Sequence, residues 1–237
     1  KTGISGQINN NIVTDGLVFY VDPAYKKSWA GPDSNTINSL VGTSVGSIYN
    51  DTSGSYGDNK SFDFDSVDDF GSISSVSNLN FGTDDLTYSV WIKASFSSSN
   101  RYFMGTFTDP TSNNGGIAIG VHTSQYPSWR IWFSGTYFNP GTAAIIDGEW
   151  HNFILIRNSG NARVYIDSVV DMGSADGDYI DMSTKSITNS AAIQVGRLMN
   201  GLEYWNGQIG PIQIYNRALS ASEVLQNYQA QKERFGL

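Results

Sequence analysis

The chain has 237 residues, no cysteine and a formal net charge of −8, from 14 basic and 22 acidic residues. A chain of this length can bury roughly 70% of the surface that it exposes when unfolded, so it can form one core without disulfides or thiolate zinc sites. It has no basic run, and no apolar run reaches the roughly 18 residues of a membrane span, which excludes nucleic acid as a partner and membrane insertion.

The sequence predicts one folded domain. Residues 1–14 are polar and rich in asparagine and are predicted to form an N-terminal arm or linker. No internal repeat or change of composition marks a second boundary, so residues 15–237 are predicted to form a single domain. Aspartate outnumbers glutamate by 18 to 4, which favours turns and strand ends over helices.

Short segments of period two, rich in β-branched and aromatic residues, predict strands along the whole domain. In chain order they are residues 17–21, 61–65, 87–92, 116–121, 129–133, 152–156, 163–167, 192–196 and 208–215. No segment of helical period reaches ten residues between them, so the alternation of strands and helices that is typical of a parallel sheet is missing. The pattern predicts an all-β fold, a two-sheet antiparallel sandwich.

Residues 220–236 are the exception and predict one short C-terminal helix. Ser220 and Glu223 have the spacing of a capping box, while Val224, Leu225 and Tyr228 share a face. The interpretation from these residues is a helix that covers the sandwich, and the alternative is a helix that binds a partner.

The most informative motif is a predicted hairpin, DGEWHNF at residues 147–153 followed by VYID at residues 164–167. It resembles a recurring hairpin of the laminin-G-like jelly roll in the concanavalin A-like lectin/glucanase superfamily. Further pieces follow in the order of that family, among them GLVFYVD at 16–22, LTYSVWI at 86–92 and WNGQI at 205–209. The resemblance implies a two-sheet jelly roll that is used mostly to bind glycans or proteins.

The two ends of the chain add a second resemblance. The opening IVTDGLVFYVD at residues 12–22 and the ending YNRALSASEV at residues 215–224 are similar to versions in bacteriophage and marine-virus structural proteins. That resemblance implies a location on a virion surface or outside the cell.

An acidic run is the candidate metal site. Its members are Asp63, Asp65, Asp68 and Asp69. In a strand of period two the first two carboxylates point to one face and the phenylalanines at 62 and 64 to the other. Carboxylates on one face can hold a structural Ca²⁺, which takes six to eight oxygen ligands. The alternative is a plain hairpin turn at residues 66–67 with solvated acids. No other cofactor is expected.

Aromatic, amide and charged residues in predicted loops are the candidate ligand-binding site. Sugars present flat C–H faces and dense hydroxyl edges, which aromatic rings and amide or guanidinium donors complement. The selected residues are Tyr126, Trp205, Tyr204, Asn113, Asn114, Asn200, Arg101 and His122. The alternative is that the aromatic side chains fill the ends of the sandwich.

The sequence argues against an enzyme. The glucanases of the superfamily use a Glu-x-Asp-x-Glu strand, and the four glutamates of this chain, at 149, 203, 223 and 233, form no such motif. There is also no nucleophile elbow, phosphate loop or dinucleotide fingerprint. His151 stands in an alternating strand without a nucleophile partner and is interpreted as structural.

The predicted function is therefore a non-catalytic carbohydrate-binding or adhesion module of a virion or cell-surface structural protein, with a glycan or host surface as its partner. The alternative is an assembly subunit without glycan binding, such as a capsid decoration, fibre or tail protein. Such a subunit would contact copies of itself or other virion proteins.

Overall fold

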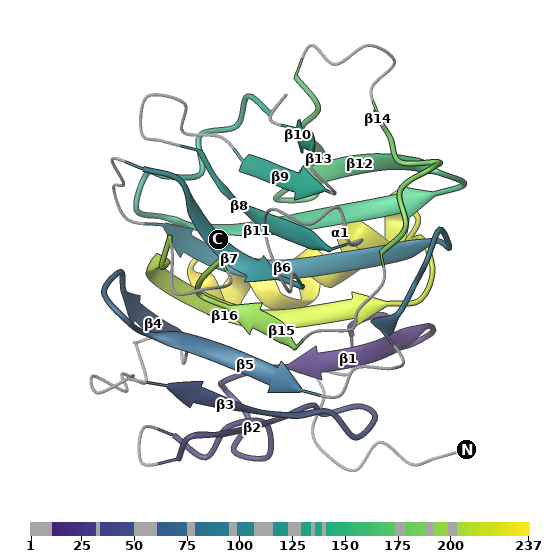
Figure 1. Ribbon diagram of the computed structural model, residues 1–237. Helices are drawn as coiled ribbons and strands as arrows, with labels where there is room; N and C mark the ends of the chain where they lie inside the picture. The colour runs from purple at the N-terminus through teal and green to yellow at the C-terminus, as the bar shows by residue number, and fades with distance from the viewer. Residues whose placement is uncertain are drawn as a thin grey trace.

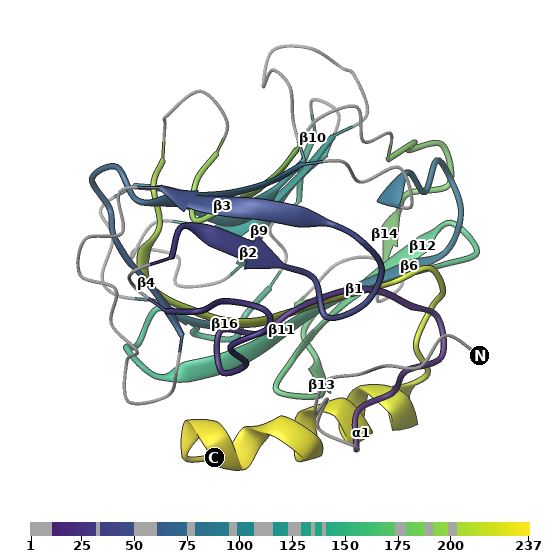
Figure 2. The same cartoon turned by 90° about the horizontal axis from the view of Figure 1, so that it is seen from below.

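The structure, a computed structural model, forms two antiparallel sheets that pack face to face, with one helix outside them (Figure 1). It describes residues 11–31, 34–49, 61–74, 79–94, 99–106, 116–122, 129–133, 136–138, 141–173, 179–187, 192–198 and 203–237. Within these ranges the predicted all-β sandwich with one C-terminal helix is confirmed. Figure 2 shows the resulting layers, with sheet B above sheet A and the helix below.

Sheet A has the strand order β1-β16-β6-β11-β12-β13, with β4 paired to β16 and β14 paired to β12. Its strands are β1 (Leu17–Val21), β4 (Phe62–Asp65), β6 (Leu86–Ala94), β11 (Trp150–Asn158), β12 (Asn161–Ile166), β13 (Val169–Val170), β14 (Ile180–Asp181) and β16 (Asn206–Tyr215). The last strand of the chain therefore lies in the middle of this sheet.

Sheet B has the strand order β10-β9-β8-β7-β15-β5-β3-β2. Its strands are β2 (Thr36–Asn38), β3 (Val45–Tyr49), β5 (Phe70–Ser74), β7 (Arg101–Gly105), β8 (Ile117–Val121), β9 (Trp129–Phe133), β10 (Thr136–Phe138) and β15 (Ile193–Val195). Because β4 belongs to sheet A and β5 to sheet B, the turn between them crosses from one sheet to the other. The alternative of a plain hairpin turn at residues 66–67 is therefore wrong.

The main core lies between the sheets and is filled by side chains that alternate along the strands. Phe19, Phe62 and Phe103 have no exposed surface, and Trp29 and Trp129 almost none. Burying such rings contributes about 1.5–3 kcal/mol each, which makes them a main source of stability.

The helix covers the outer face of sheet A. It consists of α1 (Ala221–Gln231) and a 3-10 turn, η3 (Lys232–Phe235). Phe235 stacks on Trp91 of β6 at 4.3 Å between ring centroids, and the indole Nε1 of Trp91 donates to Oε1 of Gln231 at 2.9 Å. Because of this cover, β6 is buried along both of its faces. Neither described helix has the length and apolar character that crossing a membrane requires.

The predicted start of the helix is confirmed, whereas its predicted apolar face is wrong in part. The Ser220 side chain accepts the Glu223 N–H, and the Glu223 carboxylate accepts the Ser220 N–H at 2.8 Å, which completes the capping box. Val224 is fully buried, but Leu225 is 47% exposed. The inward position one turn further is occupied by Asn227, a polar residue that a hydrophobic pattern does not detect.

The polar Asn227 side chain has a specific role at the start of the domain. Its Oδ1 accepts the backbone N–H of Val13 at 2.8 Å, and its Nδ2 donates to the hydroxyl of Tyr215 at 2.9 Å. The Tyr215 hydroxyl in turn donates to the carbonyl oxygen of Val13 at 3.0 Å. Ile12 and Val13, inside the predicted arm, are therefore buried against sheet A and the helix.

A buried arginine fixes the end of the β11–β12 hairpin. Arg157 has no exposed surface. Its Nε donates to the carbonyl oxygen of Asp84 at 2.7 Å, Nη1 to that of Lys185 at 2.9 Å and Nη2 to that of Gly82 at 3.0 Å. One guanidinium thus joins the hairpin to two other segments of the chain, residues 82–84 and Lys185. The acceptors in these three bonds are backbone carbonyls, not carboxylates.

A histidine between two carboxylates fixes the other end of the same hairpin. His151 Nδ1 lies 2.7 Å from Oδ2 of Asp167, and Nε2 lies 3.2 Å from Oδ1 of Asp147. Burial lowers the pKa of His151, but the hydrogen bonds and charges of Asp167 and Asp147 outweigh it and raise the pKa above its ordinary value. The two bonds join the turn before β11 to the end of β12, and the sequence-based interpretation of His151 as structural stays a prediction.

Replacing Arg157 should destabilise the fold strongly. The substitution Arg157→Met keeps the apolar stem but removes the donors to three backbone carbonyls, each part-buried. An acceptor left without a donor costs about 1–3 kcal/mol, so we expect a loss of about 2–4 kcal/mol in the free energy of unfolding, measured with urea. The control is Arg163→Met, at an exposed position of the neighbouring strand, with an expected change within about 0.5 kcal/mol. Equal effects of the two substitutions would contradict this role of Arg157.

The His151 arrangement should make stability depend on pH. A group whose pKa rises on folding stabilises the fold below its unfolded pKa, about 6.5 for histidine, and loses this contribution as the pH rises through the folded pKa. We therefore expect the difference in unfolding free energy between the unmodified chain and His151→Gln to shrink from pH 5.5 toward alkaline pH. The comparison removes the contribution of His122, whose pKa is lowered and whose effect has the opposite sign. A difference that stays constant with pH would refute the expectation.

Candidate functional site

The predicted ligand-binding residues divide into two sets. Tyr126, Asn113, Asn114 and Asn200 lie outside the described residues. The other four lie within the described residues: Arg101, His122, Tyr204 and Trp205.

Trp205 is part of the core, so its prediction as an exposed ring for a ligand is wrong. The side chain has no exposed surface, and its ring meets that of Phe103 edge-to-face at 5.5 Å. Its backbone N–H donates to the carbonyl oxygen of Gly196 at 2.7 Å, which brings the chain across the end of the sandwich just before β16. The alternative stated from the sequence, an aromatic side chain that fills the end of the sandwich, applies here.

Arg101 and His122 do come together, at one end of sheet B. Arg101 opens β7 opposite Val121, the last residue of β8, and His122 follows directly. Arg130 of the next strand, β9, lies opposite Gly120. The three basic side chains thus stand on three adjacent strands at the same end.

Glu203 joins this group from the segment before β16. Glu203 has a left-handed backbone with φ of 56°, and its carbonyl oxygen accepts the N–H of Tyr102. The Tyr204 side chain beside it is partly exposed. The segment therefore places the carboxylate of Glu203 beside the arginines of β7 and β9, whereas Tyr204 is not among the side chains brought together there.

The charges of this group act on one another. Burial raises the pKa of Glu203, and the positive charges of Arg130 and Arg101 oppose that rise. Burial also lowers the pKa of His122, with the charge of Arg130 acting in the same direction. The group therefore keeps His122 largely neutral near pH 7, so that its ring can both donate and accept a hydrogen bond.

An aromatic pair lies at the same end, further along sheet B. Tyr49, which closes β3, stacks on Phe70, which opens β5, at 4.5 Å between centroids and an interplanar angle of 15°. The guanidinium of Arg197, just after β15, lies 3.2 Å from the Phe70 ring centroid, and its Nε donates to Oε1 of Gln194 at 2.9 Å. Tyr49 is 44% exposed, so part of its ring is free to contact a ligand.

We call this set of side chains the arginine end of sheet B. Its members are Tyr49, Phe70, Arg101, His122, Arg130, Arg197 and Glu203. Five members were missed from the sequence: Tyr49 and Phe70, because strands β3 and β5 were not predicted, and Arg130, Arg197 and Glu203, because their proximity depends on strand order. The alternation of residues in β9 could have shown that Arg130 points out of the core, since Trp129 and Ile131 on either side of it point into the core.

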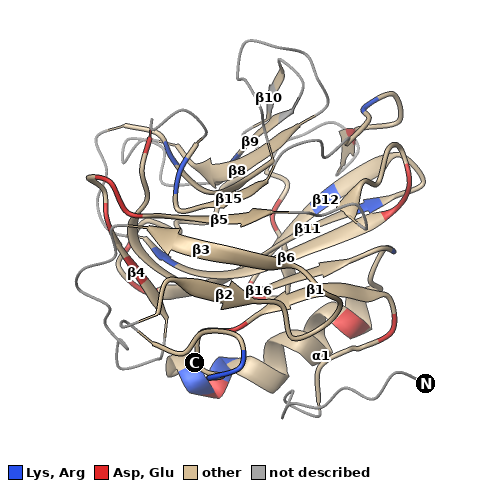
Figure 3. Cartoon of the chain, turned by 60° about the horizontal axis from the view of Figure 1, so that its bottom comes forward, with Lys and Arg blue, Asp and Glu red and all other residues tan. Residues whose placement is uncertain are grey.

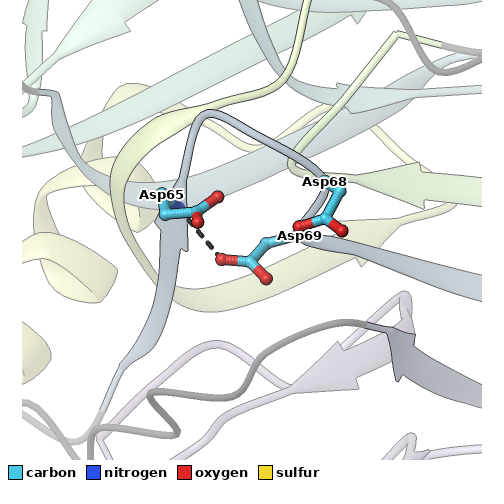
Figure 4. A group of neighbouring side chains, drawn as sticks. All are labelled: Asp65, Asp68 and Asp69. Carbon is cyan, nitrogen blue, oxygen red and sulfur yellow. Dashed lines mark hydrogen bonds between the residues drawn. The ribbon is translucent and has the colours of Figure 1, made fainter.

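The acidic run also lies beside this end, in the turn that leads from β4 into β5 (Figure 4). Carboxylate oxygens of Asp65, Asp68 and Asp69 all lie within 4.8 Å of one another. Oδ2 of Asp69 accepts the N–H of Asp65 at 3.0 Å, and Oδ1 of Asp65 accepts the N–H of Val67 at 2.8 Å. Figure 3 shows acidic positions gathered at this turn in red.

The arrangement fits a cation in part. Three carboxylates within this distance supply oxygens of the kind that Ca²⁺ binds, although two of these oxygens already accept backbone N–H groups. Asp63 is not in the group, because it lies in the paired part of β4 opposite Gln208. The predicted pairing of Asp63 with Asp65 is therefore replaced by a triad within the turn.

The comparisons with known structures agree on the fold. A sialidase of Trypanosoma rangeli, solved with 2,3-difluorosialic acid, aligns with 94% of this chain at a TM-score of 0.65 and 13% identity. The chain spans 34% of that sialidase, about a third of its length.

Two smaller structures align as well. The first is the binding domain of Paraclostridial Mosquitocidal Protein 1, at 16% identity and a TM-score of 0.56, over 90% of this chain and 52% of that one. Domain 4 of AbnA, an extracellular GH43 arabinanase of Geobacillus stearothermophilus in complex with arabinotriose, has the same identity and TM-score and is covered over 98% of its length by 90% of this chain.

No curated protein matches the chain in sequence. A family model does: the laminin-G-type model described as the concanavalin A-like lectin/glucanases superfamily matches residues 65–225, which is more than half of the chain. The match includes strands of both sheets, among them the central strands β6, β11 and β16. The chain therefore belongs to the concanavalin A-like lectin/glucanase superfamily.

Proposed function

We propose that this chain is a non-catalytic carbohydrate-binding module of a structural protein on a virion or cell surface, and that it binds its glycan at the arginine end of sheet B. The observation that carries the proposal is the placement of two stacked aromatic rings, three guanidinium groups and a carboxylate along one end of sheet B, from β3 to β9. At this end of sheet B the Tyr49 side chain is 44% exposed, so a ligand can reach its ring.

The chemistry of the arginine end suits a sugar. The exposed part of the Tyr49 ring offers a flat apolar face for the C–H groups of a pyranose or furanose. Arg101 and Arg130 offer hydrogen-bond donors, and Glu203 offers an acceptor, for sugar hydroxyls. Tyr49 on β3 is five strands from Arg130 on β9, about 24 Å at the usual strand spacing, so a ligand that contacts both is an oligosaccharide. The carboxylate also balances part of the positive charge, so an acidic sugar is not required.

The comparisons support a carbohydrate ligand in a limited way. The sialidase structures include a complex with sialic acid, and domain 4 of the arabinanase was solved with arabinotriose. The arabinanase domain is matched over nearly its whole length, whereas only a third of the sialidase is matched. The similarity therefore favours a binding role over the activity of the whole sialidase.

The described acidic groups also support a non-catalytic role. A retaining or inverting glycosidase needs two carboxyl groups free to act across one bond. Here Glu223 is held in the capping box and by Arg217, with Oε1 at 2.6 Å from Nη2, and Asp147 and Asp167 hold His151. The closely spaced carboxylates of Asp65 and Asp69 bind the backbone of their own turn.

A glycan array with neutral and acidic glycans tests the proposal. We expect the unmodified chain to bind at least one glycan, and Tyr49→Ala and Arg130→Gln each to weaken that binding about fivefold, because a lost stacking or charged contact is worth about 1 kcal/mol. The control is Leu225→Ala, an exposed side chain on the helix at the other side of the molecule, which should bind as the unmodified chain does. Absence of binding at millimolar glycan would refute the proposal, and a stable oligomer by light scattering would then favour the assembly subunit.

A structural Ca²⁺ at the acidic triad stays a prediction, and a thermal-unfolding experiment tests it. A site that is filled tenfold above its Kd stabilises the fold by about 1.4 kcal/mol, so about 1 mM Ca²⁺ should raise Tm by roughly 3–6 °C relative to EDTA. Asp68→Asn should abolish the rise, and Asp63→Asn, outside the triad, should leave it. Identical transitions in Ca²⁺ and in EDTA would show that the prediction is wrong.

A further inference from the structure

A hollow lies on the outer face of sheet A, away from the arginine end. It encloses about 560 Å³, within the range of about 300–1,000 Å³ that is common for small-molecule sites. Its floor is the β11–β12 hairpin, one wall is the segment that leads into α1, and Tyr179 lines it from the segment before β14. We call it the hairpin groove. Figure 2 shows α1 along this face of sheet A.

The strand register explains which side chains reach the groove. In the hairpin, Ile156 lies opposite Arg163 and Asn158 opposite Asn161. Period two places these four on the same face of sheet A as Tyr165, which packs in the outer apolar cluster beneath the helix. The groove therefore has an apolar side next to the helix and a polar side at the tip of the hairpin.

The hairpin tip is held rigidly. Ser159 and Gly160 both have positive φ, 50° and 81°, as a two-residue type I′ turn requires. A Cβ on Gly160 would lie 2.9 Å from the Cα of Ser183, and the N–H of Ser159 donates to Oδ1 of Asp85 at 2.7 Å. The hydrogen bonds of Arg157 to three backbone carbonyls hold the strand next to the tip as well. The polar side chains at the tip are therefore preorganised, which lowers the entropic cost of binding.

The lining combines aromatic rings with hydrogen-bonding side chains. Tyr179 is 39% exposed, and Tyr165 presents the edge of a buried ring. Asn158 and Asn161 each offer an amide that both donates and accepts, and Arg163 offers donors only. Flat apolar faces next to amide groups are the complement of a sugar ring, whose C–H face and hydroxyl edge need both.

The charges around the groove favour a neutral ligand over an anion. The start of α1 is already occupied by the carboxylate of Glu223, which accepts the Ser220 N–H and is held by Arg217. Arg163 is the one cation among the described lining residues, and Asp181 lies across from Asn161 in the β12–β14 pair. A phosphate or carboxylate would meet these acids without a free helix terminus to bind.

We propose that the hairpin groove is a second carbohydrate site, which binds one or two units of a neutral oligosaccharide with a ring face on Tyr179 and hydroxyls on Asn158, Asn161 and Arg163. This inference rests on the proposed function, since it assumes that the module recognises glycans. It adds a site on the sheet opposite the arginine end.

Titration calorimetry with neutral oligosaccharides tests the groove. The probes are maltotriose, cellotriose and arabinotriose, with sialyllactose as the acidic comparison. We expect Tyr179→Ala and Asn161→Ala each to weaken the binding of a neutral probe at least tenfold, and Leu225→Ala, at a similarly exposed position outside the groove, to leave it unchanged. Thermal unfolding of each variant, with Tm close to that of the unmodified chain, shows that the fold is intact.

The outcomes separate this inference from the proposed function. If Tyr49→Ala abolishes all sugar binding while Tyr179→Ala and Asn161→Ala bind normally, the module is a lectin and the groove proposal is overturned. If no probe binds at millimolar concentration and the array is also negative, both proposals fail. Loss of a neutral probe in the groove variants alone, with Tyr49→Ala unaffected for that probe, supports the groove.

Discussion

The burial of sheet A on both faces is the constraint on which the rest of the structure depends. One face packs against sheet B, and the other is covered by α1 and η3 through the rings of Trp91, Trp150 and Phe235. A sheet in this position needs apolar side chains on both faces, as the nearly continuous burial of β6 and β16 shows. It also needs a helix that starts at a defined place, which the capping box provides.

The same constraint decides where ligands can reach the molecule. Sheet B has no helix among the described residues, and its outer face is covered over Tyr102, Ala118 and Trp132 but leaves Tyr49 44% exposed at one end. On sheet A the cover begins at Ala221 and leaves the tip of the β11–β12 hairpin free. Both proposed sites thus lie where the helix layer is absent, one on each sheet.

The arginines show how an acidic chain concentrates positive charge locally. Arg157, Arg217 and Arg234 are engaged in the fold, with backbone carbonyls, Glu223 and Asp22 as their respective partners. The others near sheet B gather at a single end of that sheet: Arg101, Arg130 and Arg197. The overall charge of −8 therefore gives no indication of the local environment that a ligand meets.

Much of the architecture could be predicted from local patterns. Period two located the long strands, because a strand that borders a core must alternate, and Ser220 with Glu223 located the start of the helix. Short strands such as β2 and β3 were missed, since three and five residues give too short an alternating pattern and their stability comes from pairing with other strands. Leu225 was misplaced because a polar residue, Asn227, takes the inward position.

The candidate sites were harder to predict, because they depend on contacts between distant segments. Trp205 was taken for an exposed ring because it precedes an Asn-Gly pair, yet its backbone bond to Gly196 turns it into the core. Asp63 and Asp65 were paired by strand period, but the crossing from sheet A to sheet B brings Asp65 to Asp68 and Asp69 instead. The hairpin groove gave no local signal, since its lining comes from three separate segments, residues 156–165, Tyr179 and residues 219–221.

The central place of β16 has a consequence for how the chain folds. This strand lies between β1 and β6 and also pairs with β4. These three strands are synthesised earlier, so each lacks a neighbouring strand until residues 206–215 have been synthesised. Pairings of such long sequence separation close large loops and are slow to form. A ribosome must therefore release nearly the whole domain before sheet A can assemble, and during synthesis the edges of β1 and β6 are exposed to chaperones or to aggregation.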